Sequence, residues 1–456
     1  MDITTKGNEA LVEQMAELLA EGVKEWIESE PEEGIGEVET RMRHLLQEVG
    51  KRALGKSISA ADERCQRQTS CDCGGTARYV ARRPAKVLSV FGWVAYRRAY
   101  YLCPECRQGQ SPLDGRLGLR PGQVSAGLHP LLALLGVQTS FQEASKTVKR
   151  LLLLEVSDNT IRKETQQVGQ RRAAQEERWH VESQEPALLD DRQRKQEAPR
   201  RLYGSIDGVS VPIGDEWREL RAGCWYEVAP VSKRQWPSRF RKRVGQLEGL
   251  TAEKISYYCD IDHWTSFAEL AWATGCRRGA DVAPELVFVA DGAKWIWELV
   301  DLNFPQAVQI VDWYHAVEYL SPIATALLPD EQEAEAWRER MVTKLWQSEI
   351  EEVIATCQAL QDHPEAGKAA EKAVTYYQNN KHRMDYAHYR DEGYLIGSGT
   401  VESGCKQIAT MRLKRSGARW TEEGAVSTAK ARATWLSSEE EWDDATRDSS
   451  NLPLAA

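Results

Sequence analysis

Three carboxylates, each in a short glycine-containing motif, constrain this chain more than any other feature. Asp207 lies in Gly-Ser-Ile-Asp-Gly-Val-Ser, Asp291 in Val-Phe-Val-Ala-Asp-Gly-Ala-Lys, and Glu402 in Gly-Ser-Gly-Thr-Val-Glu-Ser-Gly. Each aspartate ends an apolar run typical of a buried strand, and the glutamate opens a run with helical spacing. Two acids at strand ends and one on a helix are able to hold two hard cations side by side. Such a pair of cations breaks and rejoins phosphodiesters without a protein nucleophile.

Each of these acids also has a structural interpretation. An aspartate before glycine at a strand end is commonly a turn residue, and Glu402 also fits a solvated acid at a helix start. Asp312 ends another apolar strand and is the rival for the second acid. His315 fits either a hydrogen-bonding residue of the pocket or a satisfied core histidine. The order of the acids along the chain favours the metal site.

The succession of elements from residue 201 onward predicts a mixed α/β domain. Strands are expected at 202–211, 219–228, 255–261, 286–290 and 307–311, with helices at 264–274 and 294–303. Three early strands followed by alternating helices and strands is the ribonuclease-H-like order. We therefore expect a ribonuclease-H-like catalytic domain at 201–315 and 392–436, interrupted by an all-α insertion at 316–391 and followed by an acidic tail at 437–456.

Five of the ten cysteines fall within 42 residues. Cys71 and Cys73 precede two β-like runs, and Cys103 and Cys106 follow them in Cys-Pro-Glu-Cys, the plan of a zinc ribbon at 63–110. The Cys-x-Cys half is tighter than the usual knuckle spacing, so Cys65 is a candidate to replace one of its cysteines. The alternative is a set of cysteines without metal. With no export signal, disulfides are not expected.

The segments around this ribbon are predicted to be helical. Residues 1–62 carry apolar residues at helical spacing with an acidic opposite face. Residues 111–182 show helix, short turn and a second helix opening with polar residues, which fits a helix-turn-helix DNA-binding region or an ordinary helical hairpin. Residues 183–200 are polar and bracketed by prolines, and we expect a linker.

Charge distribution indicates an anionic partner although the net charge is −10. Basic residues concentrate at 64–100, 232–243 and 406–419, and local patches rather than total charge determine affinity for phosphate. In the last patch we expect phosphate contacts from four side chains, Arg412, Lys414, Arg415 and Arg419. Trp420 either stacks on an unpaired base or packs in the core. No stretch is long and apolar enough for a membrane span and the N-terminus lacks an apolar signal core, so a cytoplasmic protein is expected.

Taken together, these motifs resemble those of the DDE transposases of bacterial insertion sequences, specifically the ISKra-type group related to mutator-like elements. The likeness covers roughly residues 65–436. It rests on the order of several motifs: Ser-Ile-Asp207-Gly, Asp291-Gly-Ala-Lys-Trp-Ile, Asp312-Trp-Tyr-His315, the Glu402 motif, Met411-Arg-Leu-Lys-Arg-Ser-Gly-Ala-Arg-Trp420 and the ribbon with Gln108-Gly-Gln-Ser-Pro-Leu-Asp114.

The resemblance implies that Asp207, Asp291 and Glu402 bind two Mg²⁺ or Mn²⁺ ions, and that Asp312 and His315 support the pocket. It also implies double-stranded DNA as substrate, at terminal inverted repeats and target sites. We expect a homo-oligomer, associated with the nucleoid of a bacterium. The alternatives are a catalytically idle DNA-binding protein derived from a transposase and a structure-specific nuclease of the ribonuclease-H-like fold.

Overall fold

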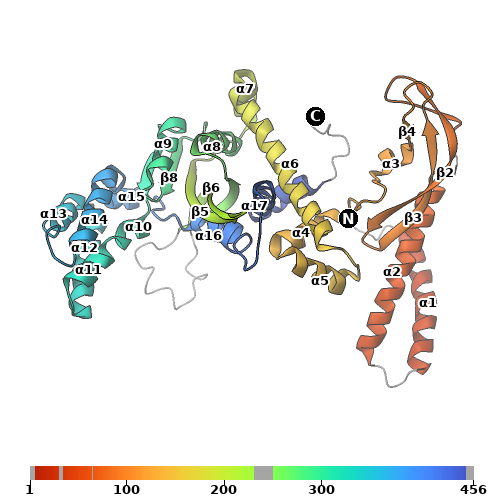
Figure 1. Cartoon of the computed structure of the whole chain (residues 1–456), viewed down its shortest axis with the longest axis horizontal. Coiled ribbons are helices and arrows are strands. Elements are labelled where there is room, and N and C mark those ends of the chain that lie inside the picture. The colour runs from red at the N-terminus through yellow and green to blue at the C-terminus, as the bar shows by residue number, and fades with distance from the viewer. Residues whose placement is uncertain (1–5, 30–33, 64, 231–249, 448–456) are drawn as a thin grey trace. The chain divides into compact units, whose positions relative to one another are not determined.

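The structure is a computed structural model that describes residues 6–29, 34–63, 65–230 and 250–447 (Figure 1). The chain divides into two compact units. Unit 1 comprises residues 1–135, 141–161 and 447–456, and unit 2 comprises residues 136–140 and 162–446. Each unit is built around its own β-sheet, so the protein is mixed α/β with an N-terminal antiparallel sheet and a second, mixed sheet.

The sheet of unit 1 is an antiparallel meander. Its strands are β1 (Gln68–Ser70), β2 (Thr76–Ser89), β3 (Gly92–Leu102) and β4 (Gly109–Gln110), in that spatial order. Ser89 pairs with Gly92 across the tight turn between the two long strands, where Gly92 has a φ of 92° that favours glycine. The two expected β-runs therefore form one hairpin, longer than the sequence pattern indicated.

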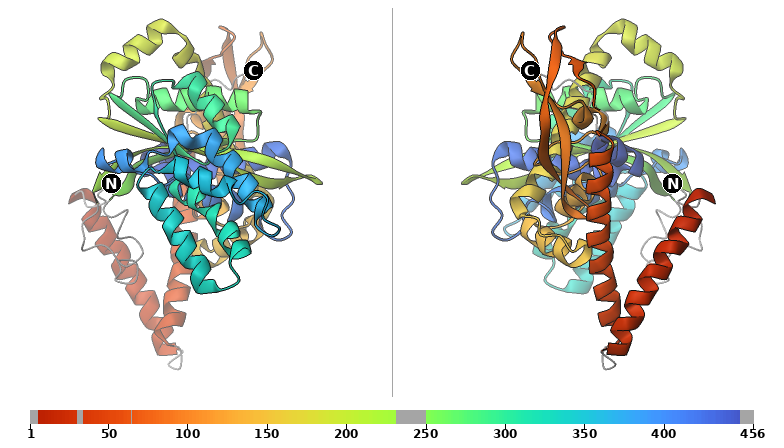
Figure 2. Two further views of the ribbon diagram at one scale, coloured as in Figure 1. Left: turned by 90° about the vertical axis from the view of Figure 1, so that its left-hand side faces the viewer. Right: turned by 90° about the vertical axis from the view of Figure 1, so that its right-hand side faces the viewer.

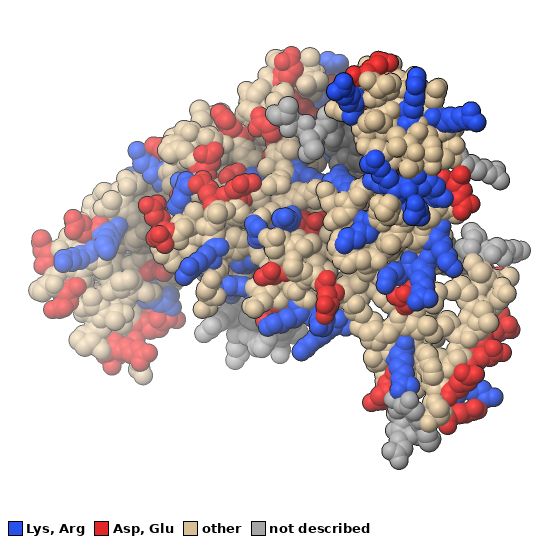
Figure 3. Space-filling model, turned by 45° about the vertical axis from the view of Figure 1, so that its right-hand side comes forward, with Lys and Arg blue, Asp and Glu red and all other residues tan. Residues whose placement is uncertain are grey.

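Two long helices precede this sheet, α1 (Lys6–Ser29) and α2 (Ile35–Ala60). Ile58 of α2 packs with Val87, Val94 and Tyr96 of the hairpin in a small apolar core. The C-terminal end of α1 lies near the N-terminal end of α2 and the two helices spread apart from there, as Figure 2 shows. The described side chains of α1 are mostly exposed. Figure 3 shows basic side chains gathered over the sheet of unit 1 and acidic ones along α1.

Helices follow the sheet along the chain. They are α3 (Pro112–Leu117), α4 (His129–Gln138), α5 (Phe141–Leu152) and α6 (Asp158–Gln184). Leu128, Leu132, Val148 and Ile161 form a second core of unit 1 with Leu88 of the hairpin. Helix α6 continues through Gly169 to Gln184. Gly169 does not end the helix but allows a close approach to Ser427, whose carbonyl oxygen would overlap a Cβ at this position.

The sheet of unit 2 has five strands in the spatial order β7-β6-β5-β8-β9. The strands are β5 (Arg201–Ile213), β6 (Glu216–Pro230), β7 (Leu250–Asp260), β8 (Glu285–Ala290) and β9 (Val308–Val311). The first three pair antiparallel, whereas β8 and β9 run parallel to β5. The first strand along the chain is therefore the central one.

Helices cover both faces of this sheet. On one face α8 (Trp264–Arg278) and α9 (Lys294–Asn303) enclose an aromatic cluster in which Trp225 contacts Phe288 and Phe304 edge-on. On the other face lie α16 (Gly399–Cys405), the π-helical turn η3 (Lys406–Thr410) and α17 (Glu422–Ser437). The Glu402 segment is thus packed against the central strands.

Helices also occupy the stretch between β9 and α16. They are α10 (Trp313–Glu318), α11 (Leu320–Leu327), α12 (Glu331–Trp346), α13 (Ile350–Gln358), α14 (Gly367–Asn380), the 3₁₀ turn η2 (Lys381–Arg383) and α15 (Tyr386–Asp391). This all-helical stretch matches the expected insertion at 316–391, and it begins three residues earlier, directly after β9.

Two segments expected to be irregular are helical. The linker at 183–200 contains α7 (Pro186–Lys195), which Arg192 ties to unit 2 through Asp281 and the carbonyl of Cys276. The acidic tail at 437–456 begins with α18 (Glu439–Thr446), whose Trp442 is buried against Trp435. In both segments tertiary contacts outweigh a polar composition. Residues 448–456 lie outside the described residues.

Candidate functional site

Three neighbouring parallel strands bring three aspartates together in unit 2: Asp207 lies within β5, and Asp291 and Asp312 directly follow β8 and β9. Gly204 of β5 pairs with Phe288 of β8, and Asp207 and Asp291 each lie three residues further along. Ala290 of β8 pairs with Val311 of β9, so Asp291 and Asp312 are the next residues of their strands. The Asp312 N–H donates to the Ala290 carbonyl oxygen at 2.8 Å. Parallel pairing alone therefore makes these acids neighbours.

Asp312 is fully buried and is the centre of a hydrogen-bond network. Its Oδ1 accepts from the backbone N–H of His315 at 2.8 Å and lies 3.1 Å from Nδ1 of the same residue. Its Oδ2 accepts from the N–H of Ser398, whose hydroxyl donates to Oε1 of Glu402 at 2.7 Å. Asp312 thus holds both the His315 ring and the segment that carries the exposed Glu402.

Among the described residues, one group of mixed carboxylate and imidazole ligands has donor atoms all within 4.8 Å of one another: Asp312, His315 and Glu402. Asp207 and Asp291 are not in that group. They join the cluster electrostatically, because the charge of Asp291 acts on Asp207 and on His315. We refer to these five residues as the acidic cluster.

The pKa values in the acidic cluster follow from crowded negative charge. Burial and the charge of Asp291 raise the pKa of Asp207, against the N–H of Gly208 that donates to its Oδ1 at 2.7 Å. The pKa of His315 is raised to about 9 by the hydrogen bond that this residue makes with Asp312, assisted by the charges of Asp291 and Glu402. Burial opposes ionisation of Asp312, but hydrogen bonds from His315 and Ser398 hold its pKa below the ordinary value. The cluster therefore carries a cationic imidazole near neutral pH.

Tyr376 of α14 is a residue of this region that the sequence did not indicate. Its hydroxyl is buried without a hydrogen-bond partner, and burial together with the charges of Tyr319, Asp291 and Asp312 raises its pKa. Its ring stacks on Tyr319 at 4.0 Å and lies where a Cβ on Gly292 would overlap it. An orphaned buried hydroxyl beside acids fits a site completed by a water or a hydrated cation. No motif near Tyr376 signals this, because a lone tyrosine in a helical stretch is usually core.

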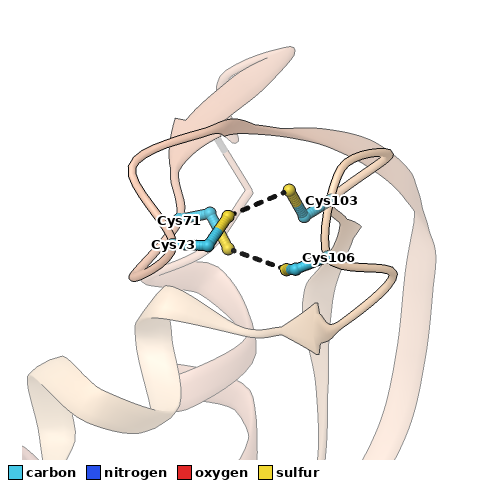
Figure 4. A group of neighbouring side chains, drawn as sticks. All are labelled: Cys71, Cys73, Cys103 and Cys106. Carbon is cyan, nitrogen blue, oxygen red and sulfur yellow. Dashed lines mark hydrogen bonds between the residues drawn. The ribbon is translucent and has the colours of Figure 1, made fainter.

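The four cysteines expected to bind zinc converge in unit 1, as Figure 4 shows. The Sγ atoms of Cys71 and Cys106 are 3.6 Å apart, as are those of Cys73 and Cys103. Tetrahedral zinc with Zn–S bonds of about 2.3 Å places its sulfurs roughly 3.8 Å apart. The four-cysteine cluster is therefore consistent with a structural zinc site. Cys65 is not one of the four and packs beside them.

Local turns explain how the short Cys-x-Cys half reaches the cluster. Gly74 has a φ of 85° and its N–H donates to the Cys71 carbonyl oxygen, while Arg107 takes a φ of 58° after the second pair.

The pKa values of the cysteine thiols differ within the cluster. The N–H of Cys106 lowers the pKa of Cys103 to about 7. A hydrogen bond from the N–H of Gly75 lowers the pKa of Cys73. Hydrogen bonds with the other three thiols outweigh it and raise that pKa to about 12. Thiolates of this kind are what a divalent metal stabilises.

The basic segment 406–419 is divided between core and surface. Arg412 is buried, donates to the Gly136 carbonyl oxygen at 2.8 Å, and has its pKa lowered to about 9 by burial and the charges of Arg415 and Arg432. Trp420 is buried and its indole N–H donates to the Leu413 carbonyl oxygen. Trp420 thus has the core position that was one of its two interpretations, and Arg412 is bonded inside the fold rather than exposed on its surface. Arg415 and Arg419 are exposed, and Lys414 is half-buried. The basic run at 232–243 lies outside the described residues.

Fold and sites together define a mixed α/β protein with a four-cysteine cluster in its N-terminal sheet and an acidic cluster at the edge of its five-stranded sheet. Residues 30–198 match the family model of UPF0236, described as an uncharacterised protein family. The chain is also 24% identical over 400 residues to a Streptococcus gallolyticus protein named "UPF0236 protein in vanSb 3'region". That similarity spans 86% of this chain and 81% of the relative. Both descriptions carry the name UPF0236, and neither names a transposase.

Within the described residues, no helix combines the length and apolarity needed to cross a lipid bilayer.

Proposed function

We propose that this protein is a metal-dependent DNA phosphoryl transferase of the DDE transposase type, acting at the inverted repeats that bound an insertion sequence. The observation that carries the proposal is the acidic cluster. Residues separated by up to 195 positions along the chain come together from the central strands and two helices. Nothing in the packing of unit 2 alone requires that several carboxylates meet there, and such crowding is unfavourable without cations.

The strand order supports a ribonuclease-H-like fold for this domain. Numbered along the chain, the five strands lie in the order 3-2-1-4-5, with only the second strand antiparallel to its neighbours. Asp207 is on the first strand, Asp291 follows the fourth, and Glu402 is on a later helix packed against the first two. These are the places at which the resemblance to ISKra-type transposases puts the metal ligands.

The hydrogen bonds suggest a division of labour among the acids. Both oxygens of buried Asp312 are engaged by His315 and Ser398, so Asp312 positions its neighbours rather than binding a cation. Asp207, Asp291 and Glu402 then remain as the residues that would hold two Mg²⁺ or Mn²⁺ ions. When bound, such ions supply activation of the attacking hydroxyl and stabilisation of the leaving oxygen. The imidazolium of His315 would offset negative charge, and its side chain, 37% exposed, would be accessible to a phosphate oxygen.

Unit 1 fits a DNA-recognition role in this proposal. The four-cysteine cluster would be a zinc ribbon, and α5 with the start of α6, which unit 1 contains up to Ile161, would be part of a helix-turn-helix. The basic side chains of the sheet of unit 1 include Arg83 and Lys86, which are exposed and lie over Tyr100 and Trp93. Cation and aromatic pairs on a surface are suited to nucleic-acid backbones and bases.

The test is strand cleavage and joining on the DNA that flanks the reading frame, with Mg²⁺ or Mn²⁺. We expect wild type to cut at the element ends. We expect Asp207→Asn, Asp291→Asn and Glu402→Gln to bind DNA but to cut at least about a thousandfold more slowly. Asp262→Asn, a loop acid of the same unit, is the matched control. Binding of the ends without cutting by wild type in either metal favours the catalytically idle DNA-binding protein, and cleavage of branched or hybrid substrates regardless of sequence favours the nuclease.

A further inference from the structure

The most exposed tryptophan described in unit 2 lies at the tip of the β5–β6 hairpin. Trp217 pairs with Pro212 and is 67% exposed. The hairpin closes at Ile213 and Glu216, with Gly214 at a φ of 59° in the two-residue turn. Such a turn is short and stiff, so it presents the indole in a fixed place. Most of the indole is therefore accessible, and an accessible aromatic ring is able to stack on a base.

The basic segment 411–420 lies beside this tip. The N–H of Gly214 donates to the Trp420 carbonyl oxygen at 2.9 Å, and Arg218 forms an ion pair with Glu422. These two bonds attach the hairpin on either side of Thr421, the N-cap residue of α17. The ammonium group of Lys414 lies 6.0 Å from the centre of the Trp217 ring.

Further groups of this surface come from the same segment. Met411 is 52% exposed, and Arg415 is exposed with its guanidinium held by the Met411 carbonyl oxygen and the Thr139 hydroxyl. An indole and a thioether flanked by fixed cations match the two needs of a nucleic-acid strand, base stacking and phosphate neutralisation.

From this arrangement we infer that Trp217, Lys414 and Arg415 form a DNA-strand contact, with the Trp217 indole stacked on an unpaired base. The structure thereby transfers the stacking role from the buried Trp420 to Trp217. The inference rests on the proposed function, because it takes the ligand to be the DNA strand that is cut. Five residues of β5 separate Asp207 from Pro212, or about 17 Å.

Two acidic residues at the tip allow a second test of the surface, in which DNA binding is expected to become tighter. Asp215 and Glu216 are exposed beside Trp217 and repel phosphate. Replacing them with Asn and Gln leaves the indole in place and removes two negative charges. The double variant is therefore expected to bind DNA more tightly, and the gain is expected to fade as salt is raised.

The experiment measures anisotropy of a fluorescein-labelled dT30 strand, and of the corresponding duplex, with the full zinc-loaded chain and no added Mg²⁺. We expect Trp217→Ala to weaken binding of the single strand about tenfold and Trp217→Phe, which keeps a stacking ring, to weaken it less than threefold. Leu302→Ala, at a residue 65% exposed on α9, is the matched control and should leave binding unchanged.

Each outcome separates the surface from the proposed function. If wild type binds DNA and Trp217→Ala binds equally well, the surface is wrong and the phosphoryl-transfer proposal stands. If Trp217→Phe loses as much affinity as Trp217→Ala, stacking is wrong. If Trp217→Ala changes only self-association at constant DNA affinity, the surface contacts protein. If wild type binds no single strand or duplex, the proposed function fails together with the inference.

Discussion

The two clusters of candidate metal ligands are assembled in opposite ways. The four cysteines belong to one small sheet and span 36 positions of the chain, from Cys71 to Cys106, counting both. The acidic cluster collects residues from three strands and two helices over 196 positions, from Asp207 to Glu402, counting both. A cluster in a small sheet needs its metal for folding, whereas a cluster at the edge of a large sheet is held by the core beneath it. The two sites should therefore respond differently to the same kind of damage.

The largest effect is expected at the cysteines. Cys103→Ser removes a buried ligand, and structural zinc contributes on the order of 10 kcal/mol to the folding of a small domain. We expect zinc content to fall from one ion per chain to none, and hydrogen-exchange protection to be lost over residues 65–110 but not over 201–311. Elemental analysis and exchange mass spectrometry measure both.

Cys65→Ser is the control for that experiment, because Cys65 packs beside the cluster without belonging to it. It should retain one zinc ion. If Cys103→Ser kept one zinc ion and full exchange protection, the claim that the four-cysteine cluster needs its metal for folding would be contradicted.

At the acidic cluster a single substitution is expected to spare stability. Burial raises the pKa of Asp207, so its folded-state pKa exceeds the unfolded value. The ionised carboxylate of Asp207 therefore destabilises the folded protein. This destabilisation is absent at low pH, grows as pH rises through the pKa of the unfolded state, and is constant above the pKa of the folded state. Without divalent metal at pH 7, the melting temperature of Asp207→Asn should equal or exceed that of wild type. The gap should close toward pH 4, and a melting temperature several degrees lower at pH 7 would contradict this.

The opposite pH dependence is expected from the histidine in the same cluster. The pKa of His315 is about 9, above its ordinary value of 6.5. Its contribution is fully present below pH 6.5 and is lost as pH rises through 9. After allowance for solvent screening the loss is about 1 kcal/mol. Melting curves from pH 6 to 10 should show it in wild type and not in His315→Gln. If the melting temperatures of wild type and His315→Gln depended on pH in the same way, His315 would not stabilise the fold through its raised pKa.

The smallest effect is expected at the serine that orients Glu402. Ser398→Ala removes a hydrogen bond worth about 1 kcal/mol, which corresponds to a roughly fivefold slower cleavage. Ser403→Ala, next to Glu402 on the exposed side of α16, should cleave at the wild-type rate. Equal rates for the two variants would show that Ser398 does not position the glutamate.

Short-range patterns in the sequence predicted most of the fold. The strands of unit 2 were placed within a few residues, and helix α9 at its observed bounds, because apolar runs and turn residues mark them directly. The four cysteines were identified for the same reason, since their spacing is a local property. Helices α7 and α18 were missed because Arg192 and Trp442 stabilise them through contacts that no local pattern shows.

Long-range geometry explains what the sequence could not supply. The acids were found from their strand ends, but the use of both Asp312 oxygens by His315 and Ser398 depends on a segment 86 residues away. The burial of Arg412 and Trp420 and the exposure of Trp217 have the same origin. A basic segment looks alike whether it folds against a core or faces solvent, and only the packing of η3 and the hairpin tip decides this.

The most direct test of the central claim is calorimetric titration of Mn²⁺ into the zinc-loaded protein at pH 7.5. Wild type is predicted to bind Mn²⁺. Asp207→Asn, Asp291→Asn and Glu402→Gln are each predicted to lose that binding while keeping their melting temperature, and Asp262→Asn is predicted to retain it. If wild type takes up no Mn²⁺, or if Asp207→Asn and Asp291→Asn bind it as wild type does, the acidic cluster is not a metal site and the proposed chemistry is contradicted.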